Sequence, residues 1–435
     1  MKEKNSKAWV VSVNMGYGHQ RTAYPLAHLA PEGKVINAND YERILDSDRI
    51  TWETNRQFYE FISNFKRIPL IGDFFFGIFD KFQKILSFYP KRDLSRPNLI
   101  LKQLFSTIKN GWGRHLIEKL SASGREKPMP LITTFFTPAF MAESFNYPEN
   151  IYCVICDADL SRSWVSLNPS QSRIKYFAPN NRVVYRLGLY GVKKENIFLT
   201  GYPLPKENLG SQKLEILKYD LGHRLRNLDP RRIYQGRYFP LIKNYVGDLP
   251  LKANHPLTIM FAIGGAGAQK EIAISAVKSL SKKIKRGKIK MILVAGIKTF
   301  IKEFFLKKIK YLGLENCLNK NIEIIWAPDI ENYFKKFNEA LRTTDVLWTK
   351  PSELSFYTGL GIPIIISPSI GSQEDFNREW LLRHGSGIPQ ENPKYTDEWL
   401  SDFLSSGSLA NAAMHGFIET KKYGTFNIEK IVQKI

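Results

Sequence analysis

Short apolar runs alternate with longer polar segments along most of the chain. In the first half, each run stops at Gly, Pro, Asn or Asp, and together they cover residues 8–13, 34–40, 129–138, 150–159, 173–180 and 196–205. Runs rich in β-branched and aromatic residues that end at turn residues are typical of strands. Helix-like segments lie between them, so the pattern predicts a parallel, doubly wound sheet.

The second half repeats this design, with predicted strands at 257–267, 288–296, 321–328, 345–350 and 362–369. Residues 206–256, between the halves, are polar and basic, and we interpret them as a linker with an insertion. The predicted fold class is therefore α/β, with two Rossmann-like domains whose parallel sheets face a cleft. The expected domains are 1–205 and 257–435, and the last helix of the second could pack back on the first.

One segment, 55–92, interrupts the first half with bulky apolar residues between lysines and arginines. Its apolar residues recur at helical spacing, which indicates a helix pair with apolar faces in the core. A second interpretation is a patch that dips into an anionic membrane surface. In that case the contacts would come from Phe74, Phe75, Phe76, Lys81 and Lys84.

The charge balance is strongly basic, with 63 Lys and Arg against 41 Asp and Glu and a formal net charge of +22. Such a surface attracts nucleic acid, an anionic membrane or nucleotide phosphates. We expect no nucleic-acid partner, because no helix-turn-helix, zinc-finger or RNP signature is present. The N-terminus has no apolar signal-peptide core, and no run of about 18 apolar residues occurs. We therefore expect a cytoplasmic protein without a membrane span.

Three cysteines are too few for a disulfide framework. Cys153 and Cys156 form a CxxC inside the apolar run IYCVICDAD, which is more typical of a buried strand than of a metal site. No second CxxC is available to complete a zinc site, and we expect no metal.

The first candidate site is the stretch NMGYGHQRTA, residues 14–23. An apolar strand here stops at two glycines, and a histidine, His19, follows directly. Glycine is expected where the backbone bends sharply or approaches a ligand. His19 would then lie near a helix N-terminus at the carboxyl edge of the sheet, where open α/β folds bind ligands. The alternative is a tight turn with a surface histidine.

The second candidate site combines two stretches of the second half. FAIGGAGAQKE, residues 261–271, predicts a strand, a glycine-rich turn and a helix start, which suits a diphosphate. It is not the GxGxxG fingerprint, and the chain has no P-loop. Further on, Glu353 would begin a helix, where it could accept both ribose hydroxyls or be a plain first-turn acid. The loop GSQEDFN, 371–377, carries donors and acceptors suited to sugar hydroxyls.

The run TKPSELSFYTGLGIPIIISPSIGSQEDFN, 349–377, resembles the TKxGPxTxxEAxxxGxPxI…GQExxN region of the monogalactosyldiacylglycerol-synthase-like glycosyltransferases. These enzymes, of the glycosyltransferase family 28 type, are relatives of the GlcNAc transferase that makes lipid II. The opening motif of that family looks like GYGHQRTA, and VICDAD, YFAPN and GYPLP are further local similarities. The resemblance covers nearly the whole chain, in order.

The resemblance implies a GT-B fold with an acceptor-binding N-terminal domain and a nucleotide-sugar-binding C-terminal domain. It implies an inverting hexosyltransferase, which moves a sugar from a UDP-linked donor to a lipid or lipid-linked acceptor. The enzyme would act without a cofactor, peripherally on the inner face of an anionic membrane. The expected donor contacts are Gly264, Gly265, Ala266, Gly267, Ala268, Lys298, Ile330, Lys350, Ser352, Glu353, Gln373, Glu374 and Asn377.

The TKxGP-type loop is two residues shorter here, so strict register would place Phe356 where the family has its ribose-binding glutamate. His19 matches the family's catalytic-site histidine, and imidazole suits a general base because it titrates near neutral pH. Asp157 and Asp159 are the rival bases. Gly16, Tyr17 and Gly18 would leave room for the acceptor, while Lys350 or Lys298 would offset the charge of the leaving diphosphate.

Two other functions fit parts of the pattern. A GT-B-like nucleotide-sugar epimerase would share the glycine loops and histidines but has no use for the Phe-rich basic segment. A basic nucleic-acid-binding protein would explain the charge alone.

Overall fold

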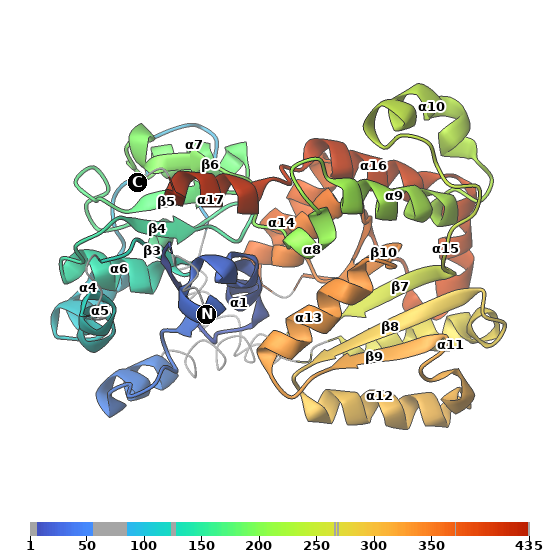
Figure 1. The fold of residues 1–435 in the computed structure, drawn as a ribbon, viewed down its shortest axis with the longest axis horizontal. Helices are drawn as coiled ribbons and strands as arrows, with labels where there is room; N and C mark the ends of the chain where they lie inside the picture. Colours follow the sequence, from blue (N-terminus) through green and yellow to red (C-terminus); the bar gives the residue numbers. More distant parts are fainter. Residues whose placement is uncertain are drawn as a thin grey trace. The chain divides into compact units, whose positions relative to one another are not determined.

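The computed structural model describes residues 7–54, 85–122, 128–264, 267, 269–369 and 371–433. They form two compact units (Figure 1). Unit 1 consists of Met1–Pro203, Gly371–Phe376 and Tyr423–Ile435, and unit 2 of Leu204–Ile370 and Asn377–Lys422. We describe each unit by itself.

Unit 1 is built on a sheet of six described strands in the order β2-β1-β3-β4-β5-β6. Every neighbouring pair is parallel, which confirms the predicted parallel sheet. The strands are β1 (Trp9–Ser12), β2 (Ile36–Asn37), β3 (Leu131–Thr133), β4 (Ile151–Val154), β5 (Lys175–Ala178) and β6 (Ile197–Leu199).

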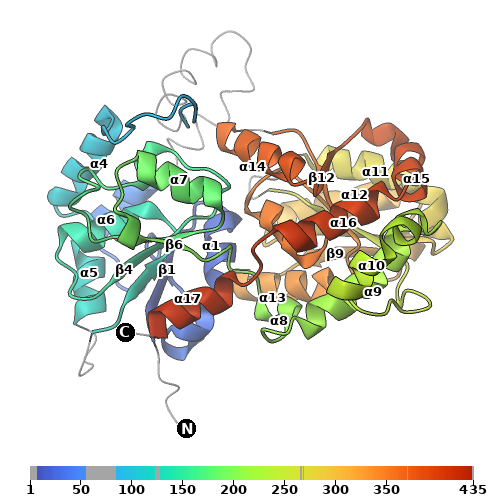
Figure 2. The ribbon, with the colours of Figure 1, turned by 90° about the horizontal axis from the view of Figure 1, so that it is seen from above.

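The helices of unit 1 pack on both faces of this sheet. They are α1 (Tyr17–Ala23), η1 (Tyr24–Leu29), η2 (Pro31–Gly33), α4 (Leu99–Lys109), α5 (Arg114–Ser121), α6 (Phe136–Ser144), η3 (Arg162–Trp164), α7 (Asn181–Leu189), η4 (Lys194–Asn196) and α17 (Gly424–Gln433). Helix α17 closes one face, where Ile428 and Val432 join a buried cluster with Val10, Leu26 and Phe177 (Figure 2). The end of the chain therefore completes the core of unit 1.

Unit 2 has a second sheet of six described strands, all parallel, in the order β12-β11-β10-β7-β8-β9. They are β7 (Leu257–Ala262), β8 (Ile289–Gly296), β9 (Ile322–Trp326), β10 (Val346–Thr349), β11 (Ile364–Ile366) and β12 (Gly387–Pro389). The first five were predicted from the sequence. The three-residue β12 was missed because its Gly-Ile-Pro sequence is too short to show an apolar run.

Helices α11 and α12 cover one face of the second sheet, and the right-handed crossover from β9 to β10 puts α13 on the other (Figure 1). The helices of this part are α8 (Lys206–Leu209), α9 (Glu215–Leu228), α10 (Ile233–Tyr245), α11 (Lys270–Lys285), α12 (Thr299–Tyr311), η5 (Glu315–Cys317), α13 (Ile330–Leu341), η6 (Glu353–Leu360), α14 (Ser372–Arg383), η7 (Pro393–Tyr395), α15 (Thr396–Ser405) and α16 (Ser408–Glu419). Residues 206–256, expected as a linker and insertion, form α8, α9 and α10 of unit 2.

Each sheet reverses its strand order at one place. In unit 1 the reversal lies between β1 and β3, and in unit 2 it lies between β7 and β10. The crossovers leave such a switch point in opposite directions, so a crevice opens beyond the carboxyl ends of the two strands. These two edges are therefore where ligand contacts are expected. Among the described residues, none of the helices is long and apolar enough to span a bilayer.

Candidate functional site

The turn after β1 carries the first group of candidate residues. Gly16 has φ 113°, outside the range that other residues adopt readily, and nothing lies within 4 Å of where its Cβ would be. The backbone conformation, rather than a lack of space, therefore calls for glycine here. The turn is held by the segment that follows the neighbouring strand β2, because the Asn14 backbone N–H donates to Asn39 Oδ1 at 2.8 Å. Tyr17 and Gly18 then begin α1.

His19 lies at the switch point of unit 1 and is oriented by the adjacent strand. Its Nδ1 is 2.9 Å from the carbonyl oxygen of Thr134, the residue after β3. A carbonyl only accepts, so Nδ1 carries the proton and the neutral ring has its lone pair on Nε2. The ring is half-buried and packs against Phe135, with ring centroids 4.7 Å apart. A histidine held in one tautomer at this edge can accept a proton through Nε2.

A cysteine that sequence reasoning placed only in a buried strand lies beside this ring. Cys153 is inside β4, whereas Cys156 follows its end and has Sγ 3.5 Å from His19 Nδ1. Both thiols are buried, as expected, and burial raises the pKa of Cys153. Neither Thr134 nor Cys156 could be assigned to His19 from sequence, since both contacts depend on the order of strands in the sheet.

The two candidate carboxylates after β4 differ sharply. Asp157 is half-buried at the carboxyl edge, where Cys156 Sγ approaches its Oδ2 at 4.0 Å. Asp159 is 2% exposed, and its two oxygens accept from Arg186 Nε and Nη2, each at 2.8 Å, and from Arg182 Nε at 2.9 Å. The expectation that Asp159 could act as a base is corrected, because both oxygens are committed to guanidinium groups.

At the switch point of unit 2, a lysine lies across the glycine turn. A Cβ added to Gly264, just after β7, would meet Lys350 Cε at 2.7 Å and Nζ at 3.4 Å. Lys350 follows β10, which pairs with β7, and the Thr349 hydroxyl donates to the Ala262 carbonyl at 3.0 Å. The absence of a side chain at Gly264 therefore lets a cation lie over this turn. Such a pair is suited to a phosphate group.

Gly267 is the other described glycine of this turn. Its φ is +71°, and an added Cβ would lie 2.7 Å from Ile301 Cδ1, a buried residue of α12. Its N–H donates to the Gly264 carbonyl at 2.8 Å, closing the turn. We expected glycine here because a phosphate needs the space. The structure adds two other reasons, which are the positive φ and the close approach of Ile301. Gly265, Ala266 and Ala268 lie outside the described residues.

The run after Lys350 folds as expected at its start. Ser352 precedes η6, and Glu353 is its first residue, 9% exposed. Phe356, the residue in strict register with the family's glutamate, is 1% exposed and packs on Trp380 with ring centroids 5.0 Å apart. Phe356 is therefore a core residue, and of the two positions only Glu353 has a side chain able to accept from ribose hydroxyls.

The remaining expected donor contacts are spread over three helix starts. Lys298 precedes α12 and Ile330 begins α13, both after strands of the second sheet. Gln373 and Glu374 are in the first turn of α14, in the segment assigned to unit 1. Asn377 is 1% exposed, and its Nδ2 donates to the Pro351 carbonyl at 3.4 Å. Asn377 thus fixes the loop that follows Lys350.

The membrane contacts expected at Phe74, Phe75, Phe76, Lys81 and Lys84 lie outside the described residues.

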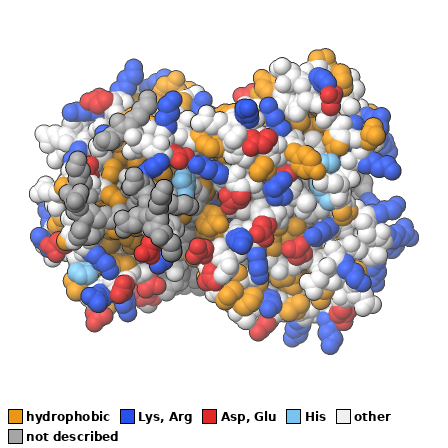
Figure 3. All heavy atoms as spheres, viewed as in Figure 1, with side chains coloured by type: hydrophobic (Ala, Val, Ile, Leu, Met, Phe, Trp, Pro, Cys, Tyr) orange, Lys and Arg blue, Asp and Glu red, His pale blue; other side chains and the backbone are white. Residues whose placement is uncertain are grey.

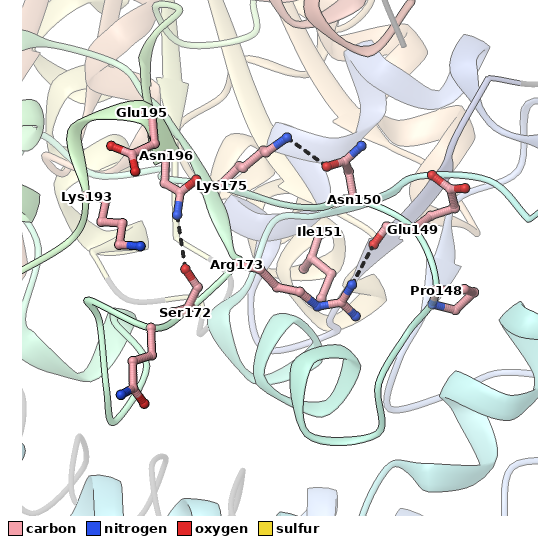
Figure 4. Close-up of a pocket in the computed structure, with 11 residues that line it drawn as sticks. Pro148, Glu149, Asn150, Ile151, Ser172, Arg173, Lys175, Lys193, Glu195 and Asn196 are labelled. Carbon is pink, nitrogen blue, oxygen red and sulfur yellow. Dashed lines mark hydrogen bonds between the residues drawn. The ribbon is translucent and has the colours of Figure 1, made fainter.

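A cavity of about 400 Å³ lies at the opposite, amino edge of the first sheet (Figure 4). It is lined by residues that precede or begin β4, β5 and β6, including Asn150, Lys175 and Asn196. Its polar groups bond to one another: Lys175 donates to Asn150 Oδ1 at 2.7 Å, and Asn196 to the Ser172 carbonyl at 3.0 Å. The cavity lies at the edge opposite to the switch point of this sheet, and its polar groups already have partners. For these two reasons we do not place the functional site there.

A family model described as "Domain of unknown function (DUF6938)" matches residues 250–321, a small part of the chain. No curated protein matches. Solved structures that are similar include MurG from Acinetobacter baumannii, at 12% identity over 99% of this chain and 100% of that one, with a TM-score of 0.46.

Two other similar structures are sugar-nucleotide epimerases. One is a UDP-GlcNAc 2-epimerase from Neisseria meningitidis bound to UDP-GlcNAc, with 11% identity, 79% and 84% of the two chains covered and a TM-score of 0.45. The other is a putative UDP-N-acetylglucosamine 2-epimerase from Listeria monocytogenes, with 13% identity, 78% and 80% covered and a TM-score of 0.44. With scores below 0.5, these likenesses carry no argument about activity. The strand orders themselves define the chain as two Rossmann-like units.

Proposed function

We propose that this chain is a glycosyltransferase that moves a sugar from a UDP-linked donor to a lipid or lipid-linked acceptor. The observation that carries the proposal is the position of Lys350 across Gly264 at the switch point of unit 2. A glycine turn at the carboxyl end of a parallel strand, with a cation over it, suits the diphosphate of a nucleotide-sugar. The sequence resemblance to the monogalactosyldiacylglycerol-synthase-like glycosyltransferases supports the same assignment.

Unit 2, together with the first turn of α14, would bind the donor. Lys350, with Lys298 as a second cation, would offset the negative charge that develops on the leaving diphosphate, so that no metal ion is required. The Glu353 carboxylate would accept from the ribose hydroxyls, and Gln373 and Glu374 would contact the sugar.

Unit 1 would bind and activate the acceptor, with Gly16, Tyr17 and Gly18 beside it. His19 Nε2 would take the proton of the acceptor hydroxyl, and the acceptor oxygen would bond to the anomeric carbon. The bond from that carbon to the β-phosphate oxygen would break, and UDP would leave. A single displacement of this kind inverts the anomeric configuration. Asp157, on the same edge of the sheet, is the alternative base.

The proposal places the protein in the cytoplasm, peripheral on the inner face of a membrane, because a lipid acceptor is presented there. The segment 55–92, with aromatic residues between lysines and arginines, is the proposed contact with anionic lipid.

Calorimetric titration with UDP and with uridine tests the donor assignment. The affinity of the Lys350→Gln variant for UDP should be lower by between about tenfold and about a hundredfold. This is the change in Kd that corresponds to the loss of one charge-assisted hydrogen bond. Its affinity for uridine should not change, because uridine has no phosphate. The control is Lys278→Gln, an exposed lysine of α11, which should bind UDP like the wild type. Equal UDP affinity in wild type and Lys350→Gln would exclude the role given to Lys350.

A further inference from the structure

Helix α12 of unit 2 has two apolar stripes. Ile301, Phe305 and Ile309, spaced four residues apart, are fully buried against the rest of unit 2. A second stripe consists of Phe300, Phe304 and Tyr311, and we call it the aromatic stripe. Phe300 is 54% exposed and Tyr311 is 85% exposed. Positions 300, 304 and 311 lie on one side of a helix with 3.6 residues per turn, so the three rings form a line in which Phe304 is half-buried between two exposed rings.

Lysines lie alongside each ring of the aromatic stripe. Lys270 Nζ is 4.8 Å from the ring centroid of Phe304 and 5.8 Å from that of Phe300. Lys308 Nζ lies between two rings, 5.8 Å from Phe304 and 5.9 Å from Tyr311. Long lysine stems can rest on apolar surface while their ammonium groups stay in water. The surface therefore presents aromatic rings and positive charges side by side.

The charge on this surface is mainly positive. From Thr299 to Tyr311 the sequence has Lys302, Lys307, Lys308 and Lys310 against one acid, Glu303. Among the described residues, Lys307, Lys308 and Lys310 form no ion pair with a carboxylate. In Figure 3, Lys or Arg and hydrophobic side chains lie along the lower edge of unit 2, where Figure 1 has α12, with some Asp or Glu side chains among them. Such a surface attracts partners of negative charge.

We propose that the aromatic stripe and the lysines around it rest on an anionic lipid bilayer. Helices that lie in a membrane interface combine Lys with Phe, Leu and aromatic residues, as here. Tyrosine is also enriched at the level of lipid headgroups. Nucleic acid fits this surface less well, because α12 has no Arg, Asn or Gln that could read bases or clamp phosphates in a fixed geometry. The surface belongs to unit 2 and is formed without residues of the segment 55–92.

The aromatic stripe also adjoins the glycine turn of unit 2. The position of a Cβ on Gly267 lies 3.6 Å from Phe300 Cε2 and 2.7 Å from Ile301 Cδ1. The first turn of α12 therefore packs directly against the turn that we assign to the donor phosphates. Bilayer contact through α12 would hold this edge of unit 2 at the membrane. The inference does not rest on the proposed function, because lipid binding can be measured without any donor.

Vesicle flotation of the full chain tests this surface. The wild type should float with vesicles of phosphatidylcholine and phosphatidylglycerol, and much less with phosphatidylcholine alone. Phe300→Ser/Tyr311→Ser should weaken binding by about tenfold or more, because each ring would bury apolar area in the interface. The matched control is Tyr238→Ser/Phe239→Ser, an exposed aromatic pair of α10 on the other side of unit 2 (Figure 1). That control should bind like the wild type, and thermal unfolding should show all variants folded.

A fluorescent label reports on α12 itself, since the segment 55–92 could also bring the protein to vesicles. All three native cysteines are buried, so a polarity-sensitive dye on Tyr311→Cys would attach at position 311. Its emission should shift to the blue with phosphatidylglycerol vesicles. The proposal is overturned if the wild type does not bind these vesicles, if the α12 variant binds equally well, or if the dye shows no shift. A variant that loses only binding to single-stranded RNA in a gel shift would assign the surface to nucleic acid instead.

Discussion

His19 shows how neighbouring residues orient a candidate catalytic side chain. The residue type alone allows either ring nitrogen to carry the proton, and the Thr134 carbonyl at 2.9 Å from Nδ1 selects one form. Because β3 is the neighbour of β1 in the sheet, this carbonyl reaches the histidine over 115 residues of sequence. The order of strands in the sheet therefore determines how this candidate base is oriented.

The turnover rate of the His19→Ala variant should be at least about 100-fold lower than that of the wild type, which is the effect expected for loss of a general base. Its circular dichroism spectrum should match that of the wild type, because the ring is only half-buried. Cys156→Ser is the control, since it changes a neighbour of the ring and leaves the Thr134 carbonyl in place. Near-normal rates in His19→Ala with a lipid acceptor would remove His19 from the mechanism.

The Glu353→Gln variant tests the ribose contact. If the carboxylate holds the ribose through two charge-assisted hydrogen bonds, its loss should weaken donor binding by about 1.5–3 kcal/mol. The wild type should discriminate against a deoxyribose donor, and the mutant should bind both donors nearly alike. Calorimetric titration of both proteins with both donors measures this, and unchanged affinity in the mutant would place the ribose elsewhere.

At the scale of the element, two glycines of one turn serve different purposes. Gly264→Ala should leave stability unchanged, because its Cβ would meet the flexible end of Lys350, but it should displace that lysine and weaken UDP binding. Gly267→Ala should cost about 1–2 kcal/mol of unfolding free energy, because φ +71° is unfavourable for alanine and Ile301 lies in the way. Denaturant unfolding and UDP titration of both variants check this, and equal stability losses would contradict it.

Asp159 attaches the loop after β4 to helix α7 through its ion pairs with Arg182 and Arg186. The Arg186 guanidinium is fully buried, and the hydrogen bonds and charge of Asp159 outweigh this burial and raise the pKa of Arg186. Asp159→Ala would leave that charge buried without its carboxylate and should destabilise unit 1 by about 3–5 kcal/mol. The half-buried Asp157 provides the comparison, and Asp157→Ala should cost far less. Similar unfolding midpoints for the two variants would show that the ion pair is not structural.

The elements that could be predicted from sequence are those whose signal is local. Eleven predicted runs contain β1 to β11, because most of these strands are buried and a buried strand needs an apolar stretch of its own. Gly264 and Lys350 were both expected at the donor site, but their contact follows from the pairing of β7 with β10. The role of Asp159 was missed because its partners, Arg182 and Arg186, lie on α7, more than 20 residues away.

At the scale of the whole molecule, each unit carries its candidate residues at the switch point of its own sheet. Unit 1 has a histidine in a fixed tautomer, and unit 2 has a glycine turn under a lysine. The net charge of +22 suits the two substrates that we propose, because a nucleotide diphosphate and the surface of an anionic membrane are both negatively charged. Two sites of different chemistry on one chain fit a reaction with two substrates.

The most direct test is a transfer assay with the full chain, a panel of UDP-sugars labelled in the sugar, and a lipid extract. The account predicts that one labelled sugar passes into the lipid fraction with inverted anomeric configuration and release of UDP, and that Lys350→Gln and His19→Ala both abolish this transfer. Conversion of a UDP-sugar to its epimer without any acceptor, and no label in lipid, would contradict the account and favour an epimerase.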